Sequence, residues 1–287
     1  MNKMKCLLCN QSDLAVLYKN KKTAVLECRN CGLGITKKTT ASSHELYKTK
    51  KYYSLAYYKK QIDKQSAKFE YLIEKIRMFI NEGKVLDVGG GFGLFSALLS
   101  VDKQFNITML EPNFRPHFLE RIKNVNHLKK PFLKFKGRKQ QYGLITFLDA
   151  LEHFKNPVEV LARAHHLLKR KGFVAILLPN YKSAMRYSSE NWSWWMLEDH
   201  QFHFSRNSMK KLLGQTGFAI VYMDTFESLQ DFWLNLQGNA SFVRDPSLRK
   251  LAKAFLLGPF FGLYLLLRPL VWYLKAGGLL FVIAQKK

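Results

Sequence analysis

The chain has 287 residues, 47% of them apolar, which suffices for one large domain with a buried core and a second, smaller module. Its 46 basic and 21 acidic residues leave a formal net charge of +25. Such a charge favours polyanionic partners, namely nucleic acid, anionic lipid or phosphate-bearing molecules. A solvated basic surface with no such partner would give the same net charge. No apolar run follows the start of the sequence, so no secretory signal is expected and the predicted location is the cytoplasm.

All four cysteines lie within the first 31 residues, as Cys6-x-x-Cys9 and Cys28-x-x-Cys31. Two such pairs supply four thiolates for one tetrahedral Zn²⁺, and their spacing is typical of zinc ribbons. Because all four ligands come from the protein, no coordination position stays open, and the predicted zinc is structural. It would supply much of the folding free energy of a module too small to have its own core.

Residues 85–93 contain the most informative motif of the chain. The apolar run Val85-Leu86-Asp87-Val88 predicts a buried strand, glycines follow at 89, 90, 91 and 93, and residues 94–99 favour a helix. A strand, a glycine turn and a helix bring a nucleotide-like ligand close to bare backbone. An acid at position 87 would repel a pyrophosphate, so the turn suits a cationic or hydroxyl-bearing ligand better.

Strand and helix patterns alternate on both sides of this motif. A helix is predicted over 60–80, strands over 106–112, 142–148 and 173–180, and a helix over 157–169. A helix over 207–217 and strands over 218–222 and 277–287 complete the order. The near-continuous apolar strands predict a parallel sheet buried on both faces, which is an α/β fold. Glu111 ends the second strand, at the offset where an acid binds ribose hydroxyls in nucleotide folds.

The motif Asp87-x-Gly89-x-Gly91-x-Gly93 resembles the first motif of class I S-adenosylmethionine (SAM)-dependent methyltransferases. Leu151-Glu152-His153, followed by Pro157, resembles the segment after their fourth strand. The resemblance covers residues 60–225 and 277–287 and implies a Rossmann-like sheet whose last strand is antiparallel. It also implies SAM as the cofactor, bound by Asp87, Gly89, Gly91, Gly93 and Glu111, with Asp149 beside the methionine part or the acceptor.

Two further segments are interpreted through this resemblance. Family members usually carry an acid near the adenine after the third strand, but residues 128–133 contain none, so Phe132 or a backbone group would take its place. Residues 41–60 combine lysines with five tyrosines, a composition that could bind nucleic acid. The resemblance favours instead a linker that folds over the cofactor site.

Methyl transfer to a hydroxyl or carbon needs a base, and three histidines are candidates. His153 follows the fourth strand, where the methyl group should point, while His200 and His203 lie in the predicted substrate loop. A structural role for His153 is an equal alternative. The same loop carries Trp192, Trp194 and Trp195, which could stack on an acceptor or insert into the core.

Residues 254–274 are apolar over a length that could span a membrane. Arg268 lies inside the segment, and Pro259 and Pro269 are expected to break a helix there. If residues 279–284 belong to the sheet, both ends of residues 254–274 must lie on the same side of the membrane, which a single crossing would not allow. We therefore expect a helical pair docked on an anionic membrane surface, with a cap over the sheet or a dimer contact as the alternative.

The predicted organisation is a zinc ribbon (1–40), a SAM-dependent methyltransferase domain (41–235), an apolar and basic helical insertion (236–276) and the last strand (277–287). The predicted function is methylation of a small-molecule, glycan or lipid-linked acceptor by a cytoplasmic enzyme peripheral to the inner membrane face. The alternative is an RNA methyltransferase that uses its ribbon and lysines to bind phosphates.

Overall fold

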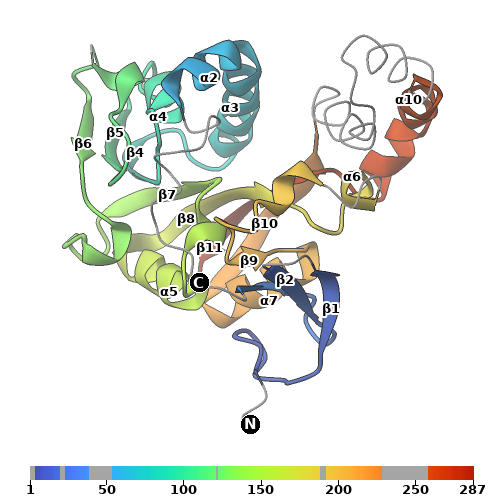
Figure 1. The fold of residues 1–287 in the computed structure, drawn as a ribbon. Helices are drawn as coiled ribbons and strands as arrows, with labels where there is room; N and C mark the ends of the chain where they lie inside the picture. Colours follow the sequence, from blue (N-terminus) through green and yellow to red (C-terminus); the bar gives the residue numbers. More distant parts are fainter. Residues whose placement is uncertain (1–3, 20–22, 39–53, 121, 188–191, 228–257) are drawn as a thin grey trace.

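The computed structural model describes residues 4–19, 23–38, 54–120, 122–187, 192–227 and 258–287. A seven-stranded sheet with the order β10-β11-β8-β7-β4-β5-β6 forms its centre (Figure 1). Neighbours from β8 to β6 are parallel, whereas β11 is antiparallel to both β8 and β10. The strands are β4 (Gly83–Val88), β5 (Phe105–Leu110), β6 (Val125–Leu128), β7 (Tyr142–Leu148), β8 (Leu168–Pro179), β10 (Phe218–Phe226) and β11 (Leu279–Lys286).

Helices cover both faces of this sheet, as Figure 1 shows. On one face lie α3 (Ile62–Arg77) and α4 (Leu94–Leu99), and on the other α5 (Pro157–Leu167) and α7 (Arg206–Gln215). Alternate residues of each central strand pack on opposite sides: Val85 belongs to the core with α3 and α4, and Leu86 to the core with α5 and α7. The predicted α/β class and the antiparallel last strand are confirmed.

Local sequence signals determine where two of these helices begin. The Asn156 side chain caps α5 by accepting a hydrogen bond from the Glu159 N–H, and Pro157 occupies the first turn, where its missing N–H costs nothing. Ser205 caps α7 in a reciprocal arrangement with Ser208. The predicted starts at 157 and 207 therefore agree with the structure within a residue.

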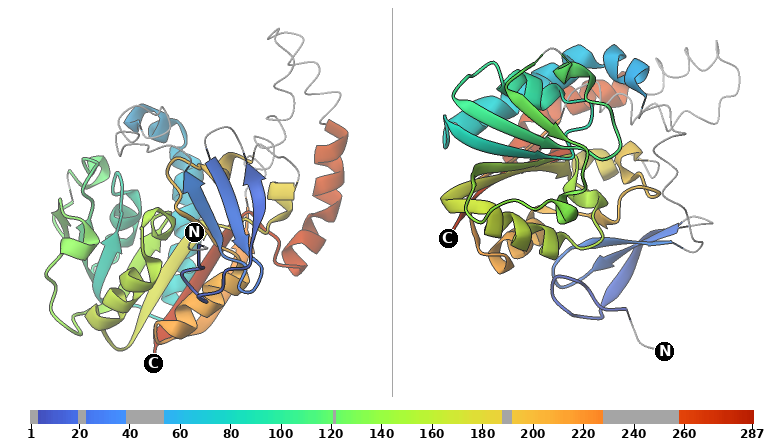
Figure 2. Two further views of the ribbon diagram at one scale, coloured as in Figure 1. Left: turned by 60° about the horizontal axis from the view of Figure 1, so that its bottom comes forward. Right: turned by 90° about the vertical axis from the view of Figure 1, so that its left-hand side faces the viewer.

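The cysteine-bearing module forms a second sheet with the order β1-β2-β3-β9. Its first three strands are β1 (Leu14–Lys19), β2 (Thr23–Cys28) and β3 (Gly34–Lys38), and β9 (Phe202–His203) comes from the loop before α7. Gly34 pairs with His203, and a side chain at position 34 would place its Cβ 2.8 Å from the Cβ of His203. The module is thus joined to the main domain by strand pairing, and Figure 2 shows it beside the large sheet.

The apolar segment near the C-terminus contains a single helix, α10 (Gly258–Tyr273), within the described residues. The expectation that Pro269 breaks a helix here was wrong, because α10 continues through it. Pro259 is the second described residue of α10, and the chain before Gly258 lies outside the described residues, so the expectation for Pro259 is not tested. No helix among the described residues is both long and apolar enough to cross a membrane.

The remaining elements are short. They are α2 (Leu55–Lys60), α6 (Ala184–Tyr187), η2 (His117–Leu119), η3 (Phe132–Lys134), η4 (Leu151–His153) and η5 (Ser193–Trp195). Most of the tyrosine-rich linker and residues 228–257, with their four basic residues, lie outside the described part of the chain.

Candidate active site at the carboxyl ends of the parallel strands

The glycine turn lies between β4 and α4. Gly89, Gly91 and Gly93 have φ of +75°, +55° and +86°, a region that residues with a Cβ rarely adopt. A Cβ at Gly89 would lie 2.9 Å from the Cβ of Ala150, and one at Gly93 2.7 Å from Cγ of Leu119. A Cβ at Gly91 would meet no atom of the described residues within 4 Å. The turn is therefore packed on its inner side, and its backbone is open to a ligand at Gly91.

Asp87 is buried beneath the turn, with 1% of its surface exposed. One carboxylate oxygen accepts a 2.7 Å hydrogen bond from Ser96 Oγ and the other a 2.7 Å bond from Thr146 Oγ1. Burial raises the pKa of this carboxyl group, while both hydroxyls lower it. The side chain connects β4 to α4 and β7 and holds the turn in place from below.

Glu111 follows β5, the strand beside β4, and supports the turn from the other side. It accepts hydrogen bonds from the backbone N–H of Gly91 (3.0 Å), Asn113 (2.7 Å) and Phe114 (3.3 Å). Burial raises the pKa of its carboxyl group, and these N–H groups oppose the shift. Two acidic side chains thus flank one glycine turn at the carboxyl ends of adjacent parallel strands.

Asp149, just past β7, has a φ of +53°, a rare conformation for a residue with a Cβ. Its Oδ2 forms a 2.8 Å ion pair with Lys68 of α3, whereas Oδ1 is buried without a hydrogen-bond partner among the described residues. Strained backbone and unpartnered polar atoms cluster at functional sites. Lys68 was missed by sequence reasoning because 81 residues separate it from Asp149.

Aromatic side chains line the outer side of the turn. The Tyr58 ring of α2 packs 5.1 Å from that of Phe92 and 5.9 Å from that of Phe118, and Phe92 also packs against Phe114. Burial raises the pKa of Tyr58, and the nearby Asp149 and Asp87 add to the shift. The end of the tyrosine-rich linker therefore does lie against the glycine turn, and Phe92 fills the space between them. Phe132, the candidate adenine contact, is instead buried in the core against Phe147.

His153 and His200 lie together beyond Asp149. Their ring centres are 4.9 Å apart, and His153 Nδ1 lies 3.3 Å from the carbonyl oxygen of Asp199. Burial lowers the pKa of His153, which favours the neutral form of its imidazole. Glu152 Oε1 lies 4.0 Å from His200 Nε2, and burial raises the pKa of Glu152 well above its usual range.

His203 lies deeper, in β9. Its Nε2 is 2.9 Å from Thr36 Oγ1 of β3, and its ring packs against Trp195. Burial lowers its pKa to about 3. Trp195 and Trp192 are themselves buried in a cluster with Tyr181 and Tyr264 of α10, which places them in the core rather than on an open acceptor surface.

The four cysteine sulfurs meet in one cluster, with every pair of sulfurs within 4.8 Å. Cys6 and Cys31 Sγ are 3.5 Å apart and Cys9 and Cys28 Sγ 3.4 Å, which excludes disulfides and is close to the about 3.8 Å between two thiolates on a tetrahedral Zn²⁺. Burial raises the pKa of Cys6 and Cys31. Burial alone would also raise that of Cys9, but hydrogen bonds, the backbone at Gln11 first among them, lower it to about 6. The donor set and spacing fit a structural zinc ion.

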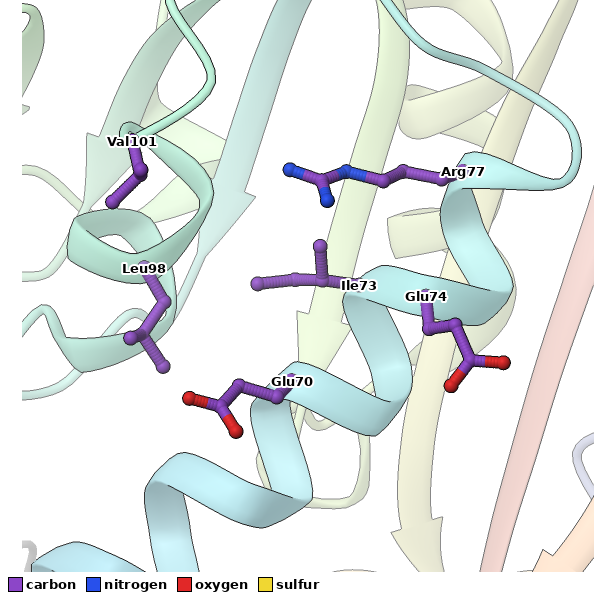
Figure 3. Close-up of a pocket in the computed structure, with 6 residues that line it drawn as sticks. All are labelled: Glu70, Ile73, Glu74, Arg77, Leu98 and Val101. Atoms are coloured by element: carbon purple, nitrogen blue, oxygen red, sulfur yellow. The ribbon is translucent and has the colours of Figure 1, made fainter.

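A hollow elsewhere on the surface contains none of these residues. It lies between α3 and α4 and is lined by Glu70, Ile73, Glu74, Arg77, Leu98 and Val101 (Figure 3). Because α3 ends just before β4 begins and α4 runs away from the glycine turn, the hollow lies towards the amino ends of the strands. Sites in such sheets form at the carboxyl ends, so the hollow is separate from the candidate site.

Comparison with known proteins agrees with this geometry. A family model described as a methyltransferase domain matches residues 58–223. A SAM-dependent methyltransferase from Archaeoglobus fulgidus is similar in structure, with a TM-score of 0.55, 17% identity, and coverage of 81% of this chain and 100% of that one. A second similar structure is that of 1,6-didemethyltoxoflavin-N1-methyltransferase from Burkholderia thailandensis, solved with bound 1,6-didemethyltoxoflavin and S-adenosylhomocysteine. It has a TM-score of 0.53, 14% identity, and coverage of 95% and 99%. No curated protein sequence is significantly similar to this chain.

The fold and the matched family model together define a class I methyltransferase with the Rossmann-like sheet of that class. The chain belongs to the methyltransferase-domain family and is a SAM-dependent methyltransferase.

Proposed function

We propose that SAM binds along the glycine turn, with its ribose towards Glu111 and its methionine part towards Gly89, Gly91 and Asp149. Glu111 accepts hydrogen bonds from the turn at Gly91 and from the loop after β5 at Asn113. The backbone at Gly91 has space beside it for a ligand. Asp149 has a buried oxygen without a partner among the described residues, which can accept from an ammonium group. Asp87 has both oxygens occupied by hydroxyls, so its role in this proposal is to hold the turn.

The observation that carries the proposal is the pair of buried carboxylates on either side of a left-handed glycine turn. A pyrophosphate would be repelled by this pair, whereas a ligand with hydroxyls and positive charge is attracted. SAM brings a sulfonium-activated methyl group, so the protein must mainly align the acceptor and exclude water. The aromatic cover from Tyr58 and Phe92 serves the second task.

On the acceptor side we assign His153 and His200, with His203 behind them. A neutral imidazole at His153 can accept a proton from a hydroxyl acceptor. His203 is buried and bonded to Thr36, which favours a role in positioning the loop that carries His200. The cysteine cluster holds a structural Zn²⁺ in this proposal, because its four thiolates leave no coordination position for a substrate.

The proposed acceptor is a small-molecule, glycan or lipid-linked compound reached at a membrane surface. Only Tyr264 of α10 is buried, and nine large apolar side chains at its surface and just after it are exposed. They are Phe260, Leu263, Leu265, Leu266, Leu267, Leu270, Trp272, Tyr273 and Leu274. An exposed apolar surface of this extent, with Trp and Tyr at one end and a net charge of +25 on the chain, favours docking on an anionic membrane.

The experiment is a transfer assay with methyl-labelled SAM and the zinc-loaded protein, using small-molecule, glycan and lipid extracts and total RNA as separate acceptors. We expect label in the small-molecule, glycan or lipid fraction, and less of it after Asp149→Asn than after the control substitution Asp102→Asn, which lies beyond the carboxyl end of α4 and pairs with Arg77. Label confined to RNA would support the alternative function and contradict this one.

A further inference from the structure

A second group of metal-ligating side chains lies apart from the cysteines. Glu152 and His153 belong to η4 and His200 to the loop before β9. One ligand atom from each lies within 4.8 Å of the other two. Two imidazoles and a carboxylate are a donor set that divalent transition metals prefer in proteins.

The Glu152 carboxylate is the second observation that points to a ligand. Only 2% of its surface is exposed, and Oε2 has no hydrogen-bond partner among the described residues. Its other oxygen lies 4.0 Å from His200 Nε2, beyond hydrogen-bonding distance but near the about 3.3 Å between two ligand atoms around a tetrahedral ion. A buried carboxylate oxygen without a donor is costly, and a cation between these groups would satisfy it.

The surroundings of His153 fit the same interpretation. Its Nδ1 lies 3.3 Å from the carbonyl oxygen of Asp199. In the tautomer that donates this N–H, Nε2 carries the lone pair that a metal ion would bind, and a backbone carbonyl is one of the common second partners of a metal-bound histidine. The Gln201 N–H donates to the Glu152 carbonyl oxygen, which holds the two ligand-bearing segments together.

We propose that Glu152, His153 and His200 bind one divalent transition-metal ion beside the methyl-transfer site, distinct from the cysteine-bound zinc. Three protein ligands leave a coordination position open. The next step rests on the proposed function. A hydroxyl oxygen of the acceptor would bind at this open position, and the metal ion would lower the pKa of that hydroxyl. During transfer a C–O bond forms as the C–S bond of SAM breaks. Because Nε2 of His153 is then bound to the metal, the hydroxyl proton passes to water instead of to His153, and a methyl ether and S-adenosylhomocysteine result.

The test is metal binding by the full chain, with Co²⁺ as the probe. The zinc-loaded protein is dialysed against a weak chelator and then against Co²⁺, and bound metals are measured by elemental analysis and visible absorption. We expect one Co²⁺ per chain in addition to one Zn²⁺, with d–d bands but no thiolate-to-cobalt charge-transfer band. Glu152→Gln should weaken Co²⁺ binding at least about 100-fold.

His166→Ala is the matched control, because this exposed histidine of α5 lies outside the cluster and should bind Co²⁺ as the wild type does. His153→Gln serves as a second variant if Glu152→Gln fails to fold. No Co²⁺ beyond that bound by thiolates, or equal affinity in both ligand variants, would overturn the site. SAM titration of the same samples keeps the questions apart, since a wild-type protein that binds SAM but no Co²⁺ beyond that bound by thiolates refutes only the metal site.

Discussion

Gly93 and Gly83 share a left-handed backbone but differ in surroundings, with φ of +86° and +112°. A Cβ at Gly93 would lie 2.7 Å from Cγ of Leu119, whereas one at Gly83 meets no described atom within 4 Å. We expect Gly93→Ala to abolish SAM binding, because it displaces the turn, and Gly83→Ala to preserve it. Both should lower stability by about 1–3 kcal/mol through backbone strain. Calorimetry and thermal unfolding check the pair, and equal SAM affinities would contradict the assigned turn.

Glu111 supplies the charge proposed to hold the ribose. Glu111→Gln should weaken SAM binding about 10–100-fold, because a hydrogen bond to a charged acceptor contributes about 1.5–3 kcal/mol. Glu120→Gln is the control, because this exposed side chain pairs at the surface with Arg115 and His117 among the described residues. Unchanged SAM affinity in a folded Glu111→Gln protein would remove Glu111 from the site.

At the scale of elements, the cysteine-bearing module is joined to the loop before α7 through β3 and β9. Gly32 next to Cys31 accepts hydrogen bonds from Tyr181 and Ser205, and Thr36 contacts His203. Removing zinc with a strong chelator should therefore expose the amides of β2 and β3 and also those of β9, while β4 and β7 remain protected. Hydrogen exchange followed by mass spectrometry measures this. Full protection of β9 in the metal-free protein would show that the ribbon and the loop are independent.

The sequence predicted the elements whose signal is local. The apolar runs of β4, β7 and β8 could be interpreted as buried strands, and Asn156-Pro157 gave the start of α5. The glycine turn could be predicted because its residues are neighbours in the chain. Glu111 could be predicted because it lies at a fixed distance in sequence from those glycines. These features cover most of the sheet and one half of the candidate site.

The features that were missed depend on distant contacts. A two-residue strand such as β9 has no periodicity, so its pairing with Gly34 could not be predicted. Lys68 meets Asp149 only because α3 packs against the sheet. Pro269 was expected to end a helix on local grounds, but the residues around it continue the helix.

At the scale of the whole molecule, the exposed apolar surface of α10 and the net charge of +25 both favour the proposed docking on an anionic membrane. Leu266→Asp should reduce binding to vesicles of phosphatidylglycerol and phosphatidylcholine, since it places a negative charge on the proposed membrane face. Val101→Asp is the matched control, because Val101 is 79% exposed and Leu266 80%, and Val101 lies beyond α4. Equal vesicle binding by the two variants would contradict membrane docking, and a dimer that dissociates only in Leu266→Asp would assign the surface to a second copy.

The net charge also allows a test of the RNA alternative. If RNA were the acceptor, binding would weaken steeply and log-linearly with salt as several phosphate contacts are lost. We expect instead that transfer to the lipid or glycan fraction continues in the presence of excess RNA. An assay with and without added RNA, over a range of salt concentrations, distinguishes the two.

The most direct measurement is calorimetric titration of the zinc-loaded full chain with SAM, beside the double variant Asp87→Ala/Gly91→Val. We predict saturable one-to-one binding by the wild type and none by the variant, since the variant removes the support below the turn and fills its open side. A well-folded wild type that does not bind SAM would contradict the central claim that the glycine turn is the cofactor site.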